Sequence, residues 1–133
     1  MYEFLYKNSQ KYDADISCCG IFDDYDDGTR IMEGSYYLSV YKNVDDAVAH
    51  VISTNLHAST VSSIYKKSVI QGCRFDENLK IAEDWLFNYH VRKKMTGCEV
   101  MENNAYYHYY INRNSVMNSG MTKEKLLNNV YVV

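Results

Sequence analysis

The sequence contains neither a long apolar run nor a block of basic residues, and these two absences disfavour whole classes of function. No apolar stretch approaches the length that crosses a bilayer, and Met1 leads into a polar, amphipathic segment instead of a signal peptide. The net charge is −3, and the lysines and arginines are dispersed, which disfavours nucleic-acid binding through a basic face. We therefore expect a cytoplasmic protein with no transmembrane segment and no nucleic-acid partner. Peripheral membrane association and a homo-oligomer both stay open.

The chain also has no proline and no Cys-x-x-Cys pair. Its cysteines lack the spacing of a zinc site, and the adjacent pair would point to opposite faces of a strand, so reduced and buried thiols are expected at Cys18, Cys19, Cys73 and Cys98. Hydrophobic residues make up 47% of the chain and charged residues 23%, which predicts a single globular domain over residues 1–133. Fourteen tyrosines fit either strands or a sugar-facing surface, and composition does not decide between them.

Hydrophobic periodicity predicts alternating helices and strands in the first half of the chain. The expected elements are a helix over 1–12, a strand over 14–22, a turn over 23–28 and a returning strand over 29–33. A second helix follows Asn43, which caps it, and its inward residues are Val44, Ala47, Val48, Val51 and Ile52. The aspartates of the turn are either a solvated hairpin tip or ligands for a hard cation, although the full calcium-loop pattern is missing; they are Asp23, Asp24, Asp26 and Asp27.

The second half of the chain is predicted to contain one apolar helix among shorter elements. The expected elements are a strand over 62–65, a turn over 69–71 capped by Ser68, a helix over 83–94, strands over 98–102 and 105–111, and a last helix over 123–130 capped by Thr122. The helix over 83–94 has one apolar stripe of Ala82, Trp85, Leu86 and Tyr89 and a second of Phe87, Val91 and Met95. We therefore expect this helix to be buried.

Two interpretations compete for Glu83 and Asp84, which begin that helix. Acidic residues are common in a first turn, where the helix dipole favours negative charge. Alternatively, one carboxylate is a general base at the floor of a cleft, because burying a carboxylate is costly unless the group is used or paired. The surrounding sequence bears on this choice.

Three segments in a fixed order carry a resemblance to a known family. FLYKNSQKYDADISCCGIF reads as a helix followed by Ala-Asp-Ile at the start of a core strand. SSIYKKSVIQGCRFDENLKIAEDWLF places Arg-Phe and then Glu-Asp before the apolar helix, and YYHYYINRNSVMNS contains Arg-x-Ser-Val-Met after a tyrosine-rich strand. Together they resemble the C-terminal half of family 2 glycosyltransferases, the bacterial type that builds capsule, lipopolysaccharide or teichoic-acid glycans.

The resemblance implies a fold and a reaction. The fold would be the C-terminal portion of a GT-A (nucleotide-diphospho-sugar transferase) fold, an α/β architecture with a mixed sheet and flanking helices, and residues 1–133 would be the acceptor-side part of the catalytic domain. Such an inverting enzyme transfers a sugar from a nucleotide-sugar donor to a glycan acceptor in bacterial surface polysaccharide synthesis. Asp84 matches its general base, and Glu83 matches a neighbour of the base in the acceptor pocket.

Four further residues have weaker assignments. Trp85 is either a face for a sugar ring or a core residue. Arg113 and Ser115 match a loop near the donor diphosphate, where an arginine would counter phosphate charge, although an ordinary loop cation is an equal alternative for Arg113. His108 is either structural or within reach of a metal, so no metal ligand is assigned.

The family's nucleotide-binding half has no counterpart in this chain. That half, on the order of 100 residues, carries the Asp-x-Asp that holds Mg²⁺ or Mn²⁺, so a divalent metal is expected in the intact parent and no cofactor in this chain. The sequence also has Val61-Ser62-Ser63 where many members carry Trp-Asn-Lys. We therefore expect a fragment or truncated form that is inactive alone. The alternative is a non-catalytic module that binds glycan or self-associates.

Overall fold

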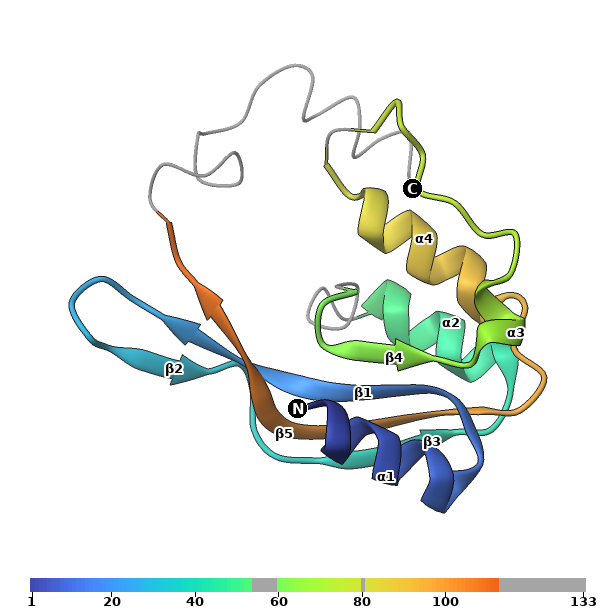
Figure 1. The fold of residues 1–133 in the computed structure, drawn as a ribbon, viewed down its shortest axis with the longest axis horizontal. Coiled ribbons are helices and arrows are strands. Elements are labelled where there is room, and N and C mark those ends of the chain that lie inside the picture. Colours follow the sequence, from blue (N-terminus) through green and yellow to red (C-terminus); the bar gives the residue numbers. More distant parts are fainter. Residues whose placement is uncertain (54–59, 80, 113–133) are drawn as a thin grey trace.

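The computed structural model describes residues 1–53, 60–79 and 81–112 (Figure 1). Helices and strands alternate along this part of the chain. The elements in order are α1 (Tyr2–Tyr12), β1 (Ala14–Asp24), β2 (Arg30–Met32), β3 (Leu38–Tyr41), α2 (Val44–Ser53), β4 (Ser63–Tyr65), α3 (Lys67–Ile70), α4 (Glu83–Arg92) and β5 (Cys98–Tyr110). None of the described helices has the length and apolar composition needed to cross a bilayer.

Strand β1 lies at the centre of a mixed sheet. One of its edges pairs in parallel with β5, from Ala14 opposite Cys98 to Asp24 opposite Tyr110. Its other edge pairs antiparallel with β4 near the start of β1 and with β2 near the end. Strand β3 joins the outer edge of β5, also antiparallel. The predicted α/β class, with a mixed sheet and flanking helices, is therefore confirmed.

Helices cover both faces of this sheet. Helix α1 lies on one face, and α2 and α4 lie on the other (Figure 1). Residues 14–21 of β1 are consequently all buried, which explains why the strand reads as a nearly continuous apolar run with little alternation. The core on the side of α2 and α4 consists of Ile16, Cys18, Ala47, Val69, Val91, Met95 and Met101.

Most predicted elements are confirmed, and Asn43 caps α2 by accepting the backbone N–H of Asp46 at 2.9 Å. The strands expected over 98–102 and 105–111 are one strand, because Asn103 and Asn104 form a bulge in the pairing with β1 and do not end the strand. The side chain of Asn103 donates to the carbonyls of Glu33 and Ser35, so this polar residue binds a neighbouring loop.

Three local predictions are wrong. Strand β3 was not predicted at all, since four residues at a sheet edge carry little periodic signal. Helix α3 begins at Lys67 with no side-chain cap, so Ser68 does not cap it. In α2, Ile52 is 60% exposed and His50 is buried in its place. The helix predicted over 123–130 lies outside the described residues.

The cysteines agree with the prediction of reduced thiols. All four are free. Cys18 and Cys19 are buried on β1, whereas Cys73 and Cys98 are half-buried. Burial raises the pKa of Cys18 to about 12, and the nearby charge of Glu99 acts in the same direction, so this thiol stays protonated and chemically inert.

One buried carboxylate fastens the start of β1 to the turn before β5. Asp15 accepts the backbone N–H groups of Thr96 and Gly97 at 2.8 and 2.7 Å, and Lys66 lies 3.2 Å from its other oxygen. A Cβ at Gly97 would stand 3.1 Å from this carboxylate, which explains the glycine. Burial alone would raise the pKa of Asp15, but the two backbone donors and Lys66 together lower it below its ordinary value.

Replacing Asp15 by asparagine is expected to lower the free energy of unfolding at pH 7 by about 1–3 kcal/mol, because charge-assisted hydrogen bonds are lost. The lowered pKa means that this stabilisation is present above the ordinary aspartate range and is lost as the pH falls through that range toward the pKa of the folded state. Urea unfolding of both proteins at pH 7 and pH 3 checks this. A difference between the two proteins that is as large at pH 3 as at pH 7 would contradict the assignment.

Candidate functional site

Glu83 and Asp84 form the first turn of α4, as the sequence predicts, and the residue before them has an unusual backbone. Ala82 has φ 64° and ψ 16°, a left-handed conformation that is rare for a residue with a Cβ. No side chain caps the helix at this position. Strained residues of this kind persist where the surrounding structure enforces them, and they cluster at functional sites. The two carboxylates therefore begin a helix whose entry is under backbone strain.

The carboxylate of Asp84 is half-buried and has few polar partners. It accepts the backbone N–H of Trp85 at 2.8 Å, and it forms no ion pair with the described residues. Burial raises the pKa of Asp84 above its ordinary value, and the negative charge of Glu83 raises it further, against the lowering effect of the backbone N–H of Trp85. A carboxylate with a raised pKa and no fixed cation is suited to accept a proton.

The inward face of α4 is polar, which corrects the prediction of a buried apolar helix. The buried residues of the helix are Asn88, Val91 and Arg92, whereas Trp85, Leu86, Phe87 and Tyr89 are only half-buried. Val91 and Met95 of the second predicted stripe belong to the core as expected, but the first stripe is not buried, and Asn88 and Arg92 complete the inward face. It also ends at Arg92, two residues before the predicted Lys94.

Arg92 and Glu99 form a fully buried ion pair beneath this helix. Arg92 donates from Nε to one oxygen of Glu99 at 2.7 Å and from Nη2 to the other at 2.6 Å. Its Nη1 donates to Oδ1 of Asn88 at 3.0 Å, and the same oxygen accepts the hydroxyl of Tyr65 at 2.8 Å. The ion pair is thus bidentate, and Nη1 of the guanidinium also binds both the side-chain and the backbone oxygen of Asn88.

His50 of α2 completes this buried polar cluster. Its Nδ1 lies 3.6 Å from Oε1 of Glu99, and its ring stacks on Tyr41 with centroids 4.4 Å apart and planes at 19°. Burial alone would raise the pKa of Glu99, but His50 and Arg92 together lower it below the ordinary glutamate value. Glu99 is therefore ionised at neutral pH and acts as the negative centre of the cluster.

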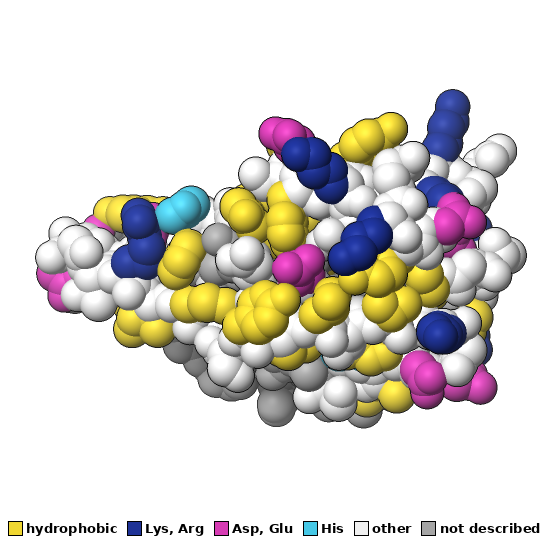
Figure 2. Space-filling model, turned by 90° about the horizontal axis from the view of Figure 1, so that it is seen from below, with side chains coloured by type: hydrophobic (Ala, Val, Ile, Leu, Met, Phe, Trp, Pro, Cys, Tyr) yellow, Lys and Arg dark blue, Asp and Glu magenta, His cyan; other side chains and the backbone are white. Residues whose placement is uncertain are grey.

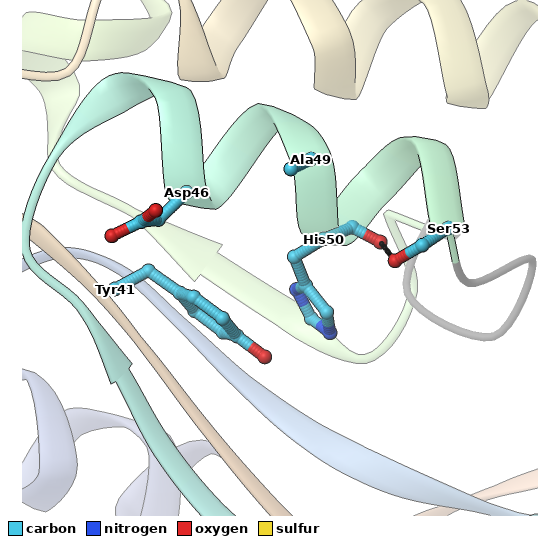
Figure 3. A pocket seen from close by; sticks show the side chains of 5 residues that line it. All are labelled: Tyr41, Asp46, Ala49, His50 and Ser53. Atoms are coloured by element: carbon cyan, nitrogen blue, oxygen red, sulfur yellow. Dashed lines mark hydrogen bonds between the residues drawn. The ribbon is translucent and has the colours of Figure 1, made fainter.

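A hollow of about 450 Å³ opens beside His50, between α2 and Tyr41 at the end of β3. Figure 3 shows Tyr41, Asp46, Ala49, His50 and Ser53 around it, with the Ser53 hydroxyl donating to the carbonyl of His50 at 3.1 Å. Neither Glu83 nor Asp84 lines this hollow. The described hollow is therefore not a cleft around the sequence-predicted carboxylates.

Of the other predicted site residues that the structure describes, Trp85 adjoins Asp84 and His108 lies on a different element. Trp85 stacks on Tyr89 with parallel rings 5.8 Å apart, and both are half-buried. His108 lies on β5 opposite Phe22 of β1. This part of the sheet is the arm that the ends of β1, β2 and β5 form away from the helices (Figure 1). Arg113 and Ser115 lie outside the described residues.

On this arm, the acidic turn is bound to neighbouring side chains. Asp24 accepts two hydrogen bonds from Arg30 and lies 3.0 Å from Nδ1 of His108, and Asp26 accepts the hydroxyl of Tyr110. Within the described part of the chain, no group of three His, Cys, Asp or Glu side chains is arranged to hold a metal ion. The structure thus gives the turn a role in joining β1 to β5.

Sequence reasoning missed the buried cluster of Asn88, Arg92, Glu99 and His50. Asn88, Glu99 and His50 each stand singly among apolar neighbours, in the stretches FNY, CEVM and AVAHVI, whereas Arg92 adjoins the lysines that follow the helix. A lone polar residue at an inward position is the signal that indicates a buried partner, although it does not say which partner. No model of a protein family matches this chain, and no curated protein matches its sequence.

Proposed function

We propose that this chain is the acceptor-side part of an inverting glycosyltransferase of the family 2, GT-A type, with Asp84 as the general base. The ordered series of sequence segments supports this proposal, and the α/β fold with a mixed sheet is compatible with it. The observation that carries it is the setting of Asp84: a half-buried carboxylate with a raised pKa at a strained helix start, held by no described cation.

The proposed chemistry needs one proton acceptor on the acceptor side. Asp84 takes the proton from an acceptor hydroxyl while that oxygen attacks the anomeric carbon of the donor sugar, and the configuration of that carbon inverts. The nucleoside diphosphate leaves with the electron pair of the broken glycosidic bond. Burial keeps the pKa of Asp84 above its ordinary value, and the negative charge of Glu83 beside it acts in the same direction.

The donor nucleotide and its divalent metal, Mg²⁺ or Mn²⁺, are assigned to an upstream half that this chain would join. Among the described residues, no group of three side chains is arranged to hold a cation. Among the described strands, β4 pairs with β1 alone, which leaves its second edge free to continue the sheet. Upstream strands could add at this edge.

Titration calorimetry of the 133-residue chain with UDP-sugars and Mn²⁺ tests whether the donor nucleotide and the metal bind only to the upstream half. We expect no measurable binding, because the residues assigned to nucleotide and metal lie upstream. Joining the chain to an upstream half that supplies an Asp-x-Asp is expected to produce metal-dependent binding and sugar transfer. Micromolar, metal-dependent binding by the chain alone would show that the donor site has been misplaced.

A second candidate, a non-catalytic glycan-binding or self-associating module, is favoured by exposed aromatic residues. Viewed from the side on which α1 lies, hydrophobic side chains form a band across the molecule (Figure 2). The exposed large hydrophobic residues include Tyr2, Tyr6, Tyr36, Leu38, Tyr106, Tyr109 and Tyr110, between 41% and 70% exposed. In this case Asp84 has no chemical role, so its replacement distinguishes the two candidates.

A further inference from the structure

Helix α4 carries Asp84, Asn88 and Arg92 at successive intervals of four residues. Side chains at this spacing lie on one face of a helix, with a small rotation from one to the next. Asn88 and Arg92 are completely buried, and Asp84 is half-buried at the N-terminal end of the same face. The candidate base therefore shares a single polar stripe with the two residues that fasten the helix to the sheet.

Two different strands hold that stripe. The Tyr65 hydroxyl of β4 donates to Asn88 Oδ1 at 2.8 Å, and Glu99 of β5 accepts two hydrogen bonds from Arg92 at 2.6 and 2.7 Å. The two anchors are linked, because Arg92 Nη1 also donates to Asn88 Oδ1 at 3.0 Å. A helix fastened at one point is free to pivot, whereas fastening at two points on separate strands fixes its rotation and its position along the axis.

Apolar packing alone would define the rotation and axial position of α4 less precisely. Hydrophobic contacts, such as those of Val91 and Phe87 in this region, are non-directional and tolerate small shifts. Bidentate arginine–carboxylate pairing is directional. A buried ion pair also adds little net stability compared with well-packed apolar residues of the same volume. What the pair supplies beyond packing is a defined orientation of α4.

We propose that Tyr65, Asn88, Arg92 and Glu99 are positioning residues that set the rotation of α4 and thereby hold the Asp84 carboxylate at the edge of the interior. The catalytic meaning of this arrangement rests on the proposed function. The geometric statement does not, because it concerns only how the helix is held. Loosening either anchor should let the first turn of α4 move toward solvent, although no changed residue touches Asp84.

The test is an NMR titration of the Asp84 side-chain carboxyl in the 133-residue chain, comparing Tyr65→Phe with the unchanged protein. We expect the Asp84 pKa to fall toward its ordinary value, since burial is the largest cause of its elevation and Glu83 is the charged group acting on it. The melting temperature should fall by on the order of a few degrees, as expected for the loss of one hydrogen bond. Tyr89→Phe is the matched control, because it removes a hydroxyl from the same helix on a face away from the anchors, and it should leave the Asp84 pKa unchanged.

A second variant makes the test independent of any one substitution. Glu99→Asp keeps the negative charge but shortens the reach to Arg92, and it should lower the Asp84 pKa in the same direction. An unchanged Asp84 pKa in a folded Tyr65→Phe or Glu99→Asp protein would overturn the proposal, and so would an equal shift in Tyr89→Phe. Neither result would bear on whether Asp84 is a base, which only transfer activity decides.

Discussion

Replacing Asp84 by asparagine in the enzyme completed by its upstream half is expected to lower the rate of sugar transfer by about 10²–10⁴-fold, the usual contribution of a general base. The amide has the same shape but cannot accept a proton from the acceptor hydroxyl, so kcat should fall much more than the KM values change. The measurement is the steady-state release of nucleoside diphosphate at saturating donor. Since the ionised form is the base, the rate of the unchanged enzyme should decline as the pH falls through the raised pKa of Asp84.

Asp45→Asn is the matched control for this prediction. Asp45 also lies in the first turn of a ten-residue helix, but its side chain is exposed on α2. The same chemical change there should leave transfer unaltered. Equal rates for Asp84→Asn and the unchanged enzyme would remove the catalytic assignment and leave the non-catalytic module as the better account.

Replacing Arg92 by alanine is expected to lower the free energy of unfolding by about 3–5 kcal/mol, the range found when one partner of a buried ion pair is removed. The loss is large because Glu99 would be left fully buried without its cation, with only weaker partners in His50 and the Cys18 thiol. Domains of this size have about 5–15 kcal/mol in total, so the change removes a substantial share. Urea unfolding followed by circular dichroism measures it.

Two comparisons separate the cost of an unpaired charge from the loss of the arginine itself. Replacing the pair together, as Arg92→Met with Glu99→Leu, should retain more stability than Arg92→Ala, because no buried charge is left without its partner. Lys7→Ala removes an ion pair of similar length, 2.6 Å to Glu3, whose side chains are 72% and 80% exposed, and no measurable change is expected. An Arg92→Ala protein as stable as Lys7→Ala would show that the buried pair is not formed.

Local sequence signals predicted much of the fold because they depend on near neighbours. Asn43 as a cap and the apolar run from Ala14 act within a few residues, and the structure confirms both. The prediction of strand ends was wrong where residues distant in the sequence determine the local structure. Asn103 looks like the end of a strand until the loop carbonyls that it binds are known.

The candidate site was predicted only in part for the same reason. Glu83 and Asp84 were placed at a helix start from their own neighbourhood, and the structure has them there. The polar face of α4 depends on Glu99, which approaches Arg92 only after the chain has turned and entered β5. Periodicity predicts that Arg92 is an exposed residue at a helix end, because no local pattern indicates that the carboxylate of Glu99 on β5 will lie beside it.

The parallel pairing of β1 with β5 also determines when the protein can fold during synthesis. The contact between Asp15 and Gly97 spans 82 positions of the chain, so β1 leaves the ribosome long before its main partner exists. Such high contact order slows folding. Until the last third of the chain has been translated, strand β1, which is apolar on both faces, lacks β5 and can pair with other chains. This strand would then be the main target of chaperones.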